Sequence, residues 1–528
     1  MVRFKTRLRA SAATLSLCFL ATGAFAQSSA PPADVPHFMI RAFAVKGNHI
    51  LPPGEVEDAV YPFTGPGKTP DDVEHARAAL QAIYEKKGYA TVSVVIPEQG
   101  IDTGVIQLQV QPQSIGKLTV SGATRTSDDW VRDRAPSLKE GNVPNFKDVQ
   151  NDIVVLNQSA DRRITPEVKA GVAPGTVDVN LAVEDQFPLH GTLELNNDSS
   201  PETSELRLSG TLRYDDLWGR GDSISLSAQT APQRSDDATV YSGNYLTHFG
   251  KLQGLFYYVH SDSDISVIGG TTVVGKGDMA GARLILPLSQ EEGFYQSLTV
   301  GIDYKNFGED VALGADRSSA PIEYFPLNLG WRGDWTTDRW KSDLSLSTTF
   351  NIRGLGDGLP AFDFKRYQAK PDFFLIHLDG SITQELPWLG LQAYQHVSGQ
   401  WSGAPLISNE QFSIGGTDTV RGYFESEALG DYGVAIQNEL RTPNFAHYLG
   451  PQVNELRGHV FFDSGYAAIH DTLMGQQQGS TLGSVGVGGS LKLFNHVNGA
   501  VDVGTPLKSG PDTSTGSVFA RFRIWGEF

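Results

Sequence analysis

The stretch Gly415–Glu425, GGTDTVRGYFE, combines one cation with glycines and closely spaced apolar side chains. Glycines allow the sharp turns of a loop, but an exposed loop tip rarely carries Val420, Tyr423 and Phe424 so close together. The guanidinium of Arg421 is planar, stays charged and can bind a carboxylate through two parallel hydrogen bonds. The pattern therefore predicts a loop that buries its apolar side chains and offers a cation to an acidic partner. An ordinary extracellular loop with a surface cation is the alternative.

A carboxylate with a defined orientation follows in the stretch Arg457–Gly465, RGHVFFDSG. Successive side chains of a β-strand point to opposite faces, so Val460 and Phe462 share one face. Asp463 falls on the opposite face, which also carries His459. The sequence therefore predicts a strand with one apolar and one polar face, and places Asp463 on the polar face.

Other kinds of chemistry find no support in the sequence. Cys18 is the only cysteine of the chain, and the 12 histidines neither cluster nor form a His-Glu-x-x-His motif. The sequence has no Gly-x-Ser-x-Gly nucleophile elbow, and the glycine-rich stretch Gly486–Ser490 opens no helix that could bind phosphate. We therefore expect no catalytic residue, no metal site, no cofactor and no enzymatic activity.

The first 26 residues predict a secretory signal peptide that is removed before the chain folds. They carry basic residues without an acid, an apolar run over residues 10–21 and the small-x-small pattern Ala24-Phe25-Ala26. The formal charge of the whole chain is −18, and loss of the four cations of this segment would make it −22. A chain this acidic is not expected to bind nucleic acid through a general basic field.

Two segments with both helical and strand patterns follow a predicted linker at residues 27–37. They cover residues 38–113 and 114–188, and each has the order β-α-α-β-β. The clearest helix lies in the first segment, where apolar residues such as Ala76 and Leu80 recur at helical spacing. Repetition of one element order predicts two copies of one small module.

The helix signals stop near Leu189, and residues 189–528 show strand alternation interrupted by turns. A helix-free segment of this length indicates a sandwich, a propeller or a barrel. Its apolar positions carry many Leu, Phe and Tyr residues near strand ends, and the gaps between strands alternate between short and long. This pattern favours an outer-membrane barrel with lipid outside and a wet lumen over a soluble sandwich.

The chain ends on an aromatic residue, Phe528, and Phe522, Ile524 and Gly526 share its face of the last predicted strand. A final strand with a terminal aromatic residue resembles the signal that the barrel assembly machinery recognises. A chance aromatic end is the alternative.

The two motifs together resemble the signature of the outer-membrane barrels that carry POTRA domains. GGTDTVRGY at Gly415–Tyr423 precedes FFDSG at Phe461–Gly465, and this ordered pair is more specific than either motif alone. The two β-α-α-β-β modules and LWGRGDSISLS at Leu217–Ser227 resemble the two-partner secretion transporters (TpsB), the ShlB/FhaC/HecB-type haemolysin secretion/activation family. The resemblance covers nearly all of residues 38–528.

This resemblance implies two POTRA modules of α+β type, followed by a transmembrane antiparallel β-barrel of 16 strands. It also implies that the loop folds back into the lumen, where Arg421 meets Asp463 on the barrel wall. The residues that match the loop motif are Val420, Arg421, Gly422 and Tyr423. Those that match the wall motif are Phe461, Asp463 and Gly465.

The family's function would make the chain an outer-membrane transporter with periplasmic POTRA domains. These domains would bind an unfolded TpsA-like client protein, which then crosses the barrel to the cell surface; activation of the client is left open. The barrel assembly machinery would insert the chain into outer-membrane lipid. An insertase of the same superfamily is the runner-up, although such relatives usually carry more POTRA modules, and a passive porin is a third possibility.

One departure from the best-known relatives concerns the helix that plugs their pore ahead of the first POTRA module. Here only residues 27–37 precede Phe38, and they include Pro31, Pro32 and Pro36. Even a fully helical segment of this length would reach about 17 Å, against a bilayer core of about 30 Å. We therefore expect no helical plug, and expect the loop around Arg421 to be the main obstruction of the lumen.

Overall fold

The computed structural model describes residues 36–528, with short internal gaps. The gaps are residues 158, 160, 202, 219–220, 264, 269–270, 289–292, 309, 314–315 and 388–389. The predicted signal peptide and nearly all of the predicted linker lie outside the described residues. The chain divides into two compact units. The first contains the described residues up to Gly116 with Glu140–Asp148 and Ala170–Val177, and the second contains Lys117–Lys139, Val149–Lys169 and Asp178–Phe528.

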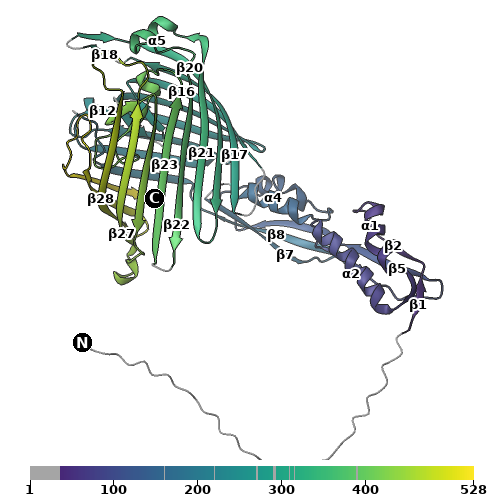
Figure 1. The fold of residues 1–528 in the computed structure, drawn as a ribbon. Helices are drawn as coiled ribbons and strands as arrows, with labels where there is room; N and C mark the ends of the chain where they lie inside the picture. Colours follow the sequence, from purple (N-terminus) through teal and green to yellow (C-terminus); the bar gives the residue numbers. More distant parts are fainter. Residues whose placement is uncertain are drawn as a thin grey trace, which may run out of the picture. The chain divides into compact units, whose positions relative to one another are not determined.

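The first β-α-α-β-β module forms a three-stranded sheet covered by two helices (Figure 1). Its elements are β1 (Phe38–Ile40), β2 (Ala42–Lys46), α1 (Pro53–Val60), η1 (Tyr61–Phe63), β3 (Gly65–Lys68), α2 (Pro70–Lys86), β4 (Val92–Val95) and β5 (Val105–Pro112). The sheet has the order β2-β5-β4, with β2 parallel and β4 antiparallel to β5. Helix α2 begins where the Asp72 carboxylate accepts the backbone N–H of Thr69 at 2.8 Å, and it buries Ala76, Leu80 and Tyr84 in the core.

The second module repeats this order. It consists of β6 (Ser114–Ser121), α3 (Asp128–Asp133), η2 (Pro136–Leu138), α4 (Phe146–Leu156), β7 (Arg162–Ala170) and β8 (Thr176–Asp185), in the sheet order β6-β8-β7. Asp185, the last residue of β8, accepts the backbone N–H groups of Arg125 at 2.9 Å and of Thr126 at 2.8 Å. The carboxylate therefore fixes the loop that leads from β6 to α3.

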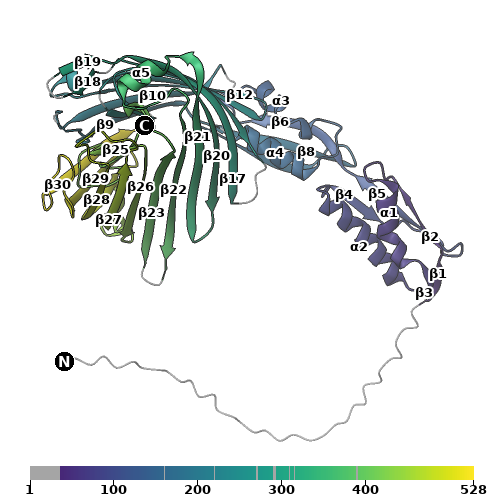
Figure 2. The same cartoon turned by 45° about the horizontal axis from the view of Figure 1, so that its top comes forward.

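Sixteen antiparallel strands form a closed barrel (Figures 1 and 2). They are β9 (Leu189–Asn196), β10 (Arg207–Leu217), β11 (Asp222–Thr230), β12 (Ala238–Phe249), β13 (Leu252–Ser263), β16 (Gly277–Pro287), β17 (Phe294–Phe307), β20 (Ile322–Thr336), β21 (Trp340–Gly356), β22 (Phe374–Leu386), β23 (Leu391–Ser402), β26 (Tyr432–Arg441), β27 (Val453–Ala468), β28 (Gly479–Leu493), β29 (Val497–Pro506) and β30 (Phe519–Glu527). The predicted fold class and strand number are confirmed.

Short elements lie in the connections of the barrel. They are η3 (Ser235–Asp237), β14 (Ile265–Ile268), β15 (Thr271–Val274), β18 (Asp310–Leu313), β19 (Asp316–Ser319), α5 (Leu359–Lys365), η4 (Ser408–Glu410), β24 (Phe412–Ile414), β25 (Ala428–Gly430) and η5 (Ala446–Tyr448). Helix α5 corrects the expectation that nothing helical follows Leu189. It was missed because seven residues cannot show a helical repeat, although Pro360 in its first turn is a helix-start signal. Among the described residues, no helix is both long and apolar enough to cross a membrane.

The two faces of the barrel strands follow the predicted alternation. On β27, the side chains of Val460 and Phe462 are exposed on the outer face, whereas Phe461 and Asp463 are buried on the inner face. Large apolar side chains are also exposed on other barrel strands, including Leu226 on β11, Val487 on β28 and Val501 on β29. Exposed apolar side chains on one face and buried polar ones on the other are typical of a barrel that contacts lipid.

The barrel closes between its first and last strands, β9 and β30, over five residue pairs from Arg523↔Asn196 to Glu527↔Thr192. By contrast, β9 pairs with β10 over eight residues. Beyond the strand end, the backbone of Phe528 exchanges hydrogen bonds with that of Gly191, at 3.1 and 3.2 Å. The phenyl ring of Phe528 lies over Gly191, where any side chain would collide with it.

The carboxylate of Asp185 predicts a pH-dependent stability of the second module. Burial raises its pKa, but hydrogen bonds from Thr124, Arg125 and Thr126 outweigh this and hold the pKa below its ordinary value. We expect Asp185→Asn to speed amide hydrogen exchange at residues 124–126 by about tenfold or more at pH 7, since hydrogen bonds to a charged group contribute about 1.5–3 kcal/mol. Because a depressed folded-state pKa stabilises the module above the unfolded pKa, the difference should persist at pH 5, begin to shrink below about pH 4 and vanish as the pH falls through the folded-state pKa. An equal difference at pH 2.5 would contradict this assignment.

Candidate functional site: a loop fastened inside the barrel

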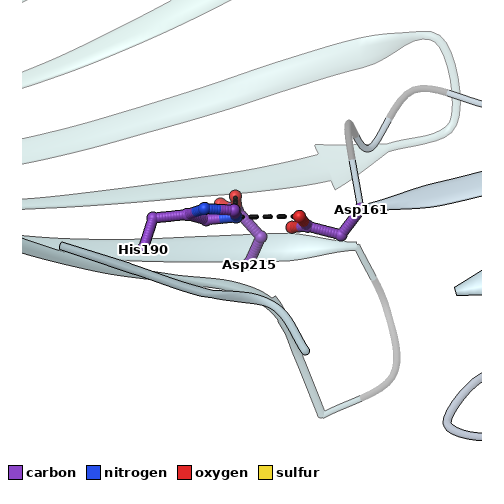
Figure 3. A group of neighbouring side chains, drawn as sticks. All are labelled: Asp161, His190 and Asp215. Atoms are coloured by element: carbon purple, nitrogen blue, oxygen red, sulfur yellow. Dashed lines mark ion pairs between the residues drawn. The ribbon is translucent and has the colours of Figure 1, made fainter. Parts of the chain in front are cut away.

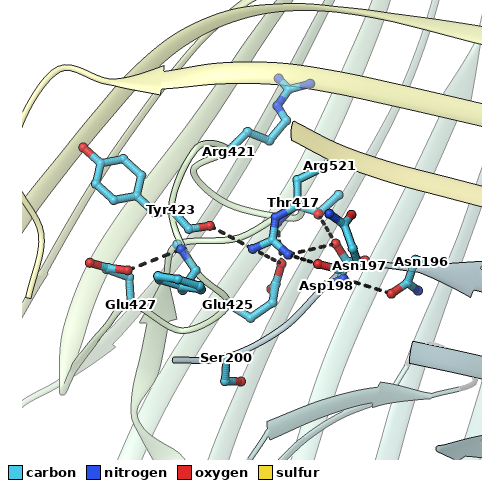
Figure 4. A network of polar contacts seen from close by, with 12 residues as sticks. Asn196, Asn197, Asp198, Ser200, Thr417, Arg421, Tyr423, Glu425, Glu427 and Arg521 are labelled. Atoms are coloured by element: carbon cyan, nitrogen blue, oxygen red, sulfur yellow. Dashed lines mark hydrogen bonds and ion pairs between the residues drawn. The ribbon is translucent and has the colours of Figure 1, made fainter. Parts of the chain in front are cut away.

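The motif loop connects β24 to β25 and lies against the inner face of the barrel (Figure 4). Its backbone turns at Gly415, Gly416 and Gly422, whose φ angles of 106°, 97° and 87° fall in the left-handed region that favours glycine. At Gly416 a side chain would also collide with the carboxylate of Glu425. The double glycine of the motif is therefore required by the path of the loop.

Arg421 binds the Asp463 carboxylate through two of its guanidinium nitrogens. Nε donates to Oδ2 at 2.7 Å and Nη2 donates to Oδ1 at 2.9 Å, and the backbone N–H of Arg421 also donates to Oδ2 at 3.2 Å. The guanidinium lies 3.9 Å from the centre of the Phe461 ring, a cation–π contact. The structure thus brings together Arg421, Phe461 and Asp463, which the sequence placed in two separate motifs.

Further carboxylates surround this cation. Arg421 Nη1 donates to Glu439 on β26, and its distance to the Asp502 carboxylate on β29 is 3.9 Å. Glu439 also accepts from Arg441 at 2.7 Å, while Asp502 contacts His459 at 2.7 Å. Arg421 therefore fastens the loop to several adjoining strands of one wall.

The burial of this pair departs from the expected wet lumen. Arg421 is 4% exposed and Asp463 is not exposed at all. A paired charge out of water is costly to separate, because removing one partner leaves the other unpaired and buried. The pair is consequently a stronger fastening than an ion pair in a water-filled pore would be.

The other motif residues pack around the pair. Val420 and Tyr423 are fully buried, and they form one apolar cluster with Ile414 and Leu482. The Tyr423 hydroxyl lies 2.9 Å from the carbonyl oxygen of Gly483 and accepts the N–H of that residue at 3.1 Å.

The glycine of the wall motif has a steric role. A Cβ at Gly465 would come within 2.8 Å of a Val420 methyl group, and its next neighbour would be a methyl group of Ile414 at 3.4 Å. The glycine therefore provides the space into which the loop packs, and a larger residue would displace the loop from the wall.

A second fastening lies on the opposite side of the loop and was not predicted. Arg521 of β30 donates to the carbonyl oxygen of Tyr423 at 3.0 Å and to that of Asn197 beyond β9, and lies 3.6 Å from Asp198 (Figure 4). The backbone N–H of Thr417 donates to Glu425 at 2.9 Å. Strand alternation back from Phe528 would have placed Arg521 on the inner face, but no motif marks it.

The loop end is held as well. Glu427 accepts the backbone N–H of Thr513 at 2.7 Å and its hydroxyl at 2.8 Å. Together these contacts seat the loop inside the barrel. None of them forms a nucleophile–base pair or an oxyanion site, so the arrangement holds a segment in place rather than performing covalent chemistry.

Comparison with known proteins identifies two matching family descriptions. Residues 175–491 match the family "Haemolysin secretion/activation protein ShlB/FhaC/HecB", and residues 38–112 match "POTRA domain, ShlB-type". The first match covers more than half of the chain.

Relatives of similar length are named as transporters. The chain is 24% identical over 457 residues to the outer membrane transporter CdiB of Dickeya dadantii, covering 84% of this chain and 78% of the relative. It is 22% identical over 396 residues to the hemolysin transporter protein ShlB of Serratia marcescens, covering 70% and 66%.

Solved structures show the same fold. CdiB from Escherichia coli aligns with a TM-score of 0.70 at 21% identity, over 96% of this chain and 93% of that one. BamA from Haemophilus ducreyi lacking POTRA domains 1–3 aligns with a TM-score of 0.55 at 12% identity, over 93% of this chain and all of the other.

The burial of Arg421 predicts that its loss releases the loop. In Arg421→Ala, Asp463 loses its counter-charge, and we expect the seated loop to be destabilised by about 3–5 kcal/mol. Chymotrypsin should then cleave the folded protein at Tyr423 or Phe424, which the wild type protects. Arg283→Ala is the matched control, since Arg283 binds Asp303 at 2.8 Å between two wall strands and does not touch the loop.

The corresponding double-mutant cycle isolates the pair. Asp463→Ala alone should also expose the loop, and the double variant should lose less protection than the sum of the two single variants. Additive losses would show that the two side chains do not act together.

Proposed function

The chain belongs to the haemolysin secretion/activation protein (ShlB/FhaC/HecB) family, and we propose that it exports one large secreted protein across the outer membrane. It is an outer-membrane transporter of the two-partner secretion type with POTRA domains in the periplasm. An unfolded client binds the POTRA domains, enters the barrel and emerges at the cell surface. The observation that carries the proposal is the seated loop: a closed barrel holds a segment that is fastened by side chains and can be released without breaking the wall.

The loop acts as the gate of the transport path. A loop with a buried, paired cation has two favourable states: seated on the wall with the ion pair formed, or released with the cation hydrated. Intermediate positions are unfavourable, because the charges would be unpaired and still buried. Entry of a client strand would exchange the contacts of Arg421 and Arg521 for contacts with client or water. Val420, Gly422, Tyr423 and Gly465 shape the seat, while Phe461 and Asp463 hold the cation.

The first POTRA module offers a specific edge for client binding. Extended peptides bind such sheets by adding a strand through main-chain hydrogen bonds. One edge strand, β4, is already covered by α2, because the Gln81 side chain donates to the carbonyl oxygen of Val92 and accepts the N–H of Val94, both at 2.9 Å. The other edge of the sheet is β2, and we assign client strand addition to it.

The second module has the same covering at its corresponding strand. The Asn157 side chain donates to the carbonyl oxygen of Ile164 at 2.9 Å and accepts its N–H at 2.6 Å, near the start of β7. Strand β7 continues to Ala170, past this covered position. The opposite edge of this sheet is β6, which corresponds to β2 of the first module, and we assign continued pairing of the client to β6.

The remaining partners follow from the location of the chain. The exposed apolar face of the barrel contacts outer-membrane lipid, and Phe528 at the end of β30 serves as the signal for the barrel assembly machinery. The chain acts without catalysis and without a cofactor, in keeping with relatives that are transporters. Export then draws its free energy from folding of the client outside the cell or from another gradient. The insertase alternative rests on the shared fold alone, whereas the named relatives support transport.

Secretion tests the gate. We expect Arg421→Ala to lower the amount of client secreted at least several-fold, while the barrel remains inserted and heat-modifiable in gel electrophoresis. The control Arg283→Ala should secrete normally. In planar bilayers, deletion of Gly416–Glu425 should raise the single-channel conductance, because the loop fills part of the lumen. Normal secretion by Arg421→Ala with a fully released loop would refute the gating role.

Client binding tests the POTRA assignment. The probe is the N-terminal region of the candidate client, a long, secreted β-repeat protein to be sought in the gene adjacent to this one. Deletion of residues 38–113 should abolish its binding to the detergent-solubilised barrel. In the full chain, bound probe should slow amide exchange in β2 but leave β4 unchanged, and Gln81→Ala should not weaken binding. Protection confined to β4 would overturn the choice of edge.

A further inference from the structure

Three potential metal ligands meet at the start of the barrel, away from the loop. They are Asp161 in the turn before β7, His190 near the beginning of β9 and Asp215 near the end of β10 (Figure 3). One ligand atom from each lies within 4.8 Å of the others. His190 Nε2 is 2.8 Å from Asp161 Oδ1 and 3.5 Å from Asp215 Oδ2.

Strand pairing and backbone hydrogen bonds hold the three potential ligands close together. His190 pairs with Arg213 across β9 and β10, so Asp215, two residues further on, shares the face of His190. The N–H of Asp215 donates to the carbonyl oxygen of Pro188 at 2.8 Å. The carbonyl oxygen of Asp161 in turn accepts the N–H of Gln186 at 2.8 Å. All three side chains are therefore attached to backbone that is itself hydrogen-bonded within one unit.

The polar atoms at this point are buried but poorly satisfied. Asp161 is 7% exposed, and its Oδ2 has no hydrogen-bond partner among the described residues. Within the same part of the chain, His190 Nε2 is also buried without a hydrogen bond, although it faces the Asp161 carboxylate. A buried carboxylate oxygen without a donor is costly, and a cation placed among these atoms would remove that cost.

We propose that Asp161, His190 and Asp215 bind a divalent transition-metal ion of the Zn²⁺ class. One imidazole nitrogen with two carboxylate oxygens is a ligand set that Zn²⁺ accepts, leaving a position for water. Ligand atoms about 2.0–2.1 Å from a tetrahedral ion lie about 3.4 Å apart. The separations of 2.8 and 3.5 Å are close to this spacing, so binding requires only small side-chain movements.

The neighbouring arginine side chains weaken the binding of a metal ion but do not prevent it. Arg213 Nε donates to Asp215 Oδ2 at 2.9 Å, the same oxygen that lies 3.5 Å from His190 Nε2, and a carboxylate oxygen that accepts one hydrogen bond keeps a second lone pair with which to ligate. Arg162 is directed to a different carboxylate, Asp216, at 3.6 Å. The simpler alternative is a protonated His190 that forms ion pairs with the two aspartates and binds no metal.

A metal at this place would join two parts of the fold. Asp161 belongs to the second module, whereas His190 and Asp215 belong to the first two strands of the barrel. The ion would stabilise that junction, which lies apart from the loop site, so the inference is independent of the proposed gating. No sequence motif marks this site, because the ligands are separated by 29 and 25 residues and lack the short spacing of a metal-binding motif.

The experiment measures metal content and binding of the full chain, purified in detergent without a polyhistidine tag and treated with chelator. We expect ZnCl₂ to bind with a stoichiometry near one in isothermal titration, with the same ratio by elemental analysis after gel filtration. Co²⁺ in its place should give the visible absorption bands of a protein-bound ion. A wild-type chain that retains no Zn²⁺ and gives no such bands overturns the proposal, whatever the behaviour of variants.

Variants locate the site. His190→Ala and Asp161→Asn should each weaken Zn²⁺ binding by at least about tenfold while the barrel stays heat-modifiable. His260→Ala is the matched control, because His260 lies at the same 2.8 Å from a carboxylate, Asp278, but belongs to no group of three potential ligands among the described residues. Equal loss of binding in His260→Ala, or full binding in His190→Ala, would show that the ion binds elsewhere.

Discussion

A buried guanidinium has to be paired, and this requirement organises the inside of the barrel. Arg421 is removed from water by the packing of Val420 and Tyr423, so it is stable only where Asp463 binds two of its three guanidinium nitrogens. The wall supplies that carboxylate from a strand whose alternate residues are exposed on the outer face of the barrel. The glycines of both motifs meet a steric requirement. They let the loop turn and come close enough to the wall for the two charged side chains to pair.

Much of this arrangement was predictable, and the limits have physical causes. Strand alternation predicted that Asp463 lies on the inner face, and the glycines of the motif predicted a loop with sharp turns. Both predictions depend on local properties of a few residues. The depth of burial was not predictable, since it depends on the meeting of segments from β24 to β30. Arg521 escaped prediction because one cation in an alternating strand carries no signal of its partner. Helix α5 escaped because it is shorter than two helical turns.

The two POTRA modules share more than an order of elements. In each, a side-chain amide at or just after the second helix pairs with the backbone of an edge strand: Gln81 with β4 and Asn157 with β7. An uncovered edge attracts any extended chain, so covering one edge leaves a single direction for pairing. The repeat thus preserves a device for choosing where a strand is added, although the surrounding residues differ between the two copies.

The short ladder between β9 and β30 has a mechanical meaning. With five residue pairs it is the shortest ladder of the closed barrel, and hydrogen bonds of Asn197 and Phe528 extend the junction beyond its two ends. Arg521 on β30 grips both the loop, at Tyr423, and the chain just past β9, at Asn197. Arg521 therefore links the loop to both strands of the closing ladder. A force that draws the loop outward would act on this short ladder at the same time. The diameter available to a passing chain and the position of the loop are mechanically coupled through this one side chain.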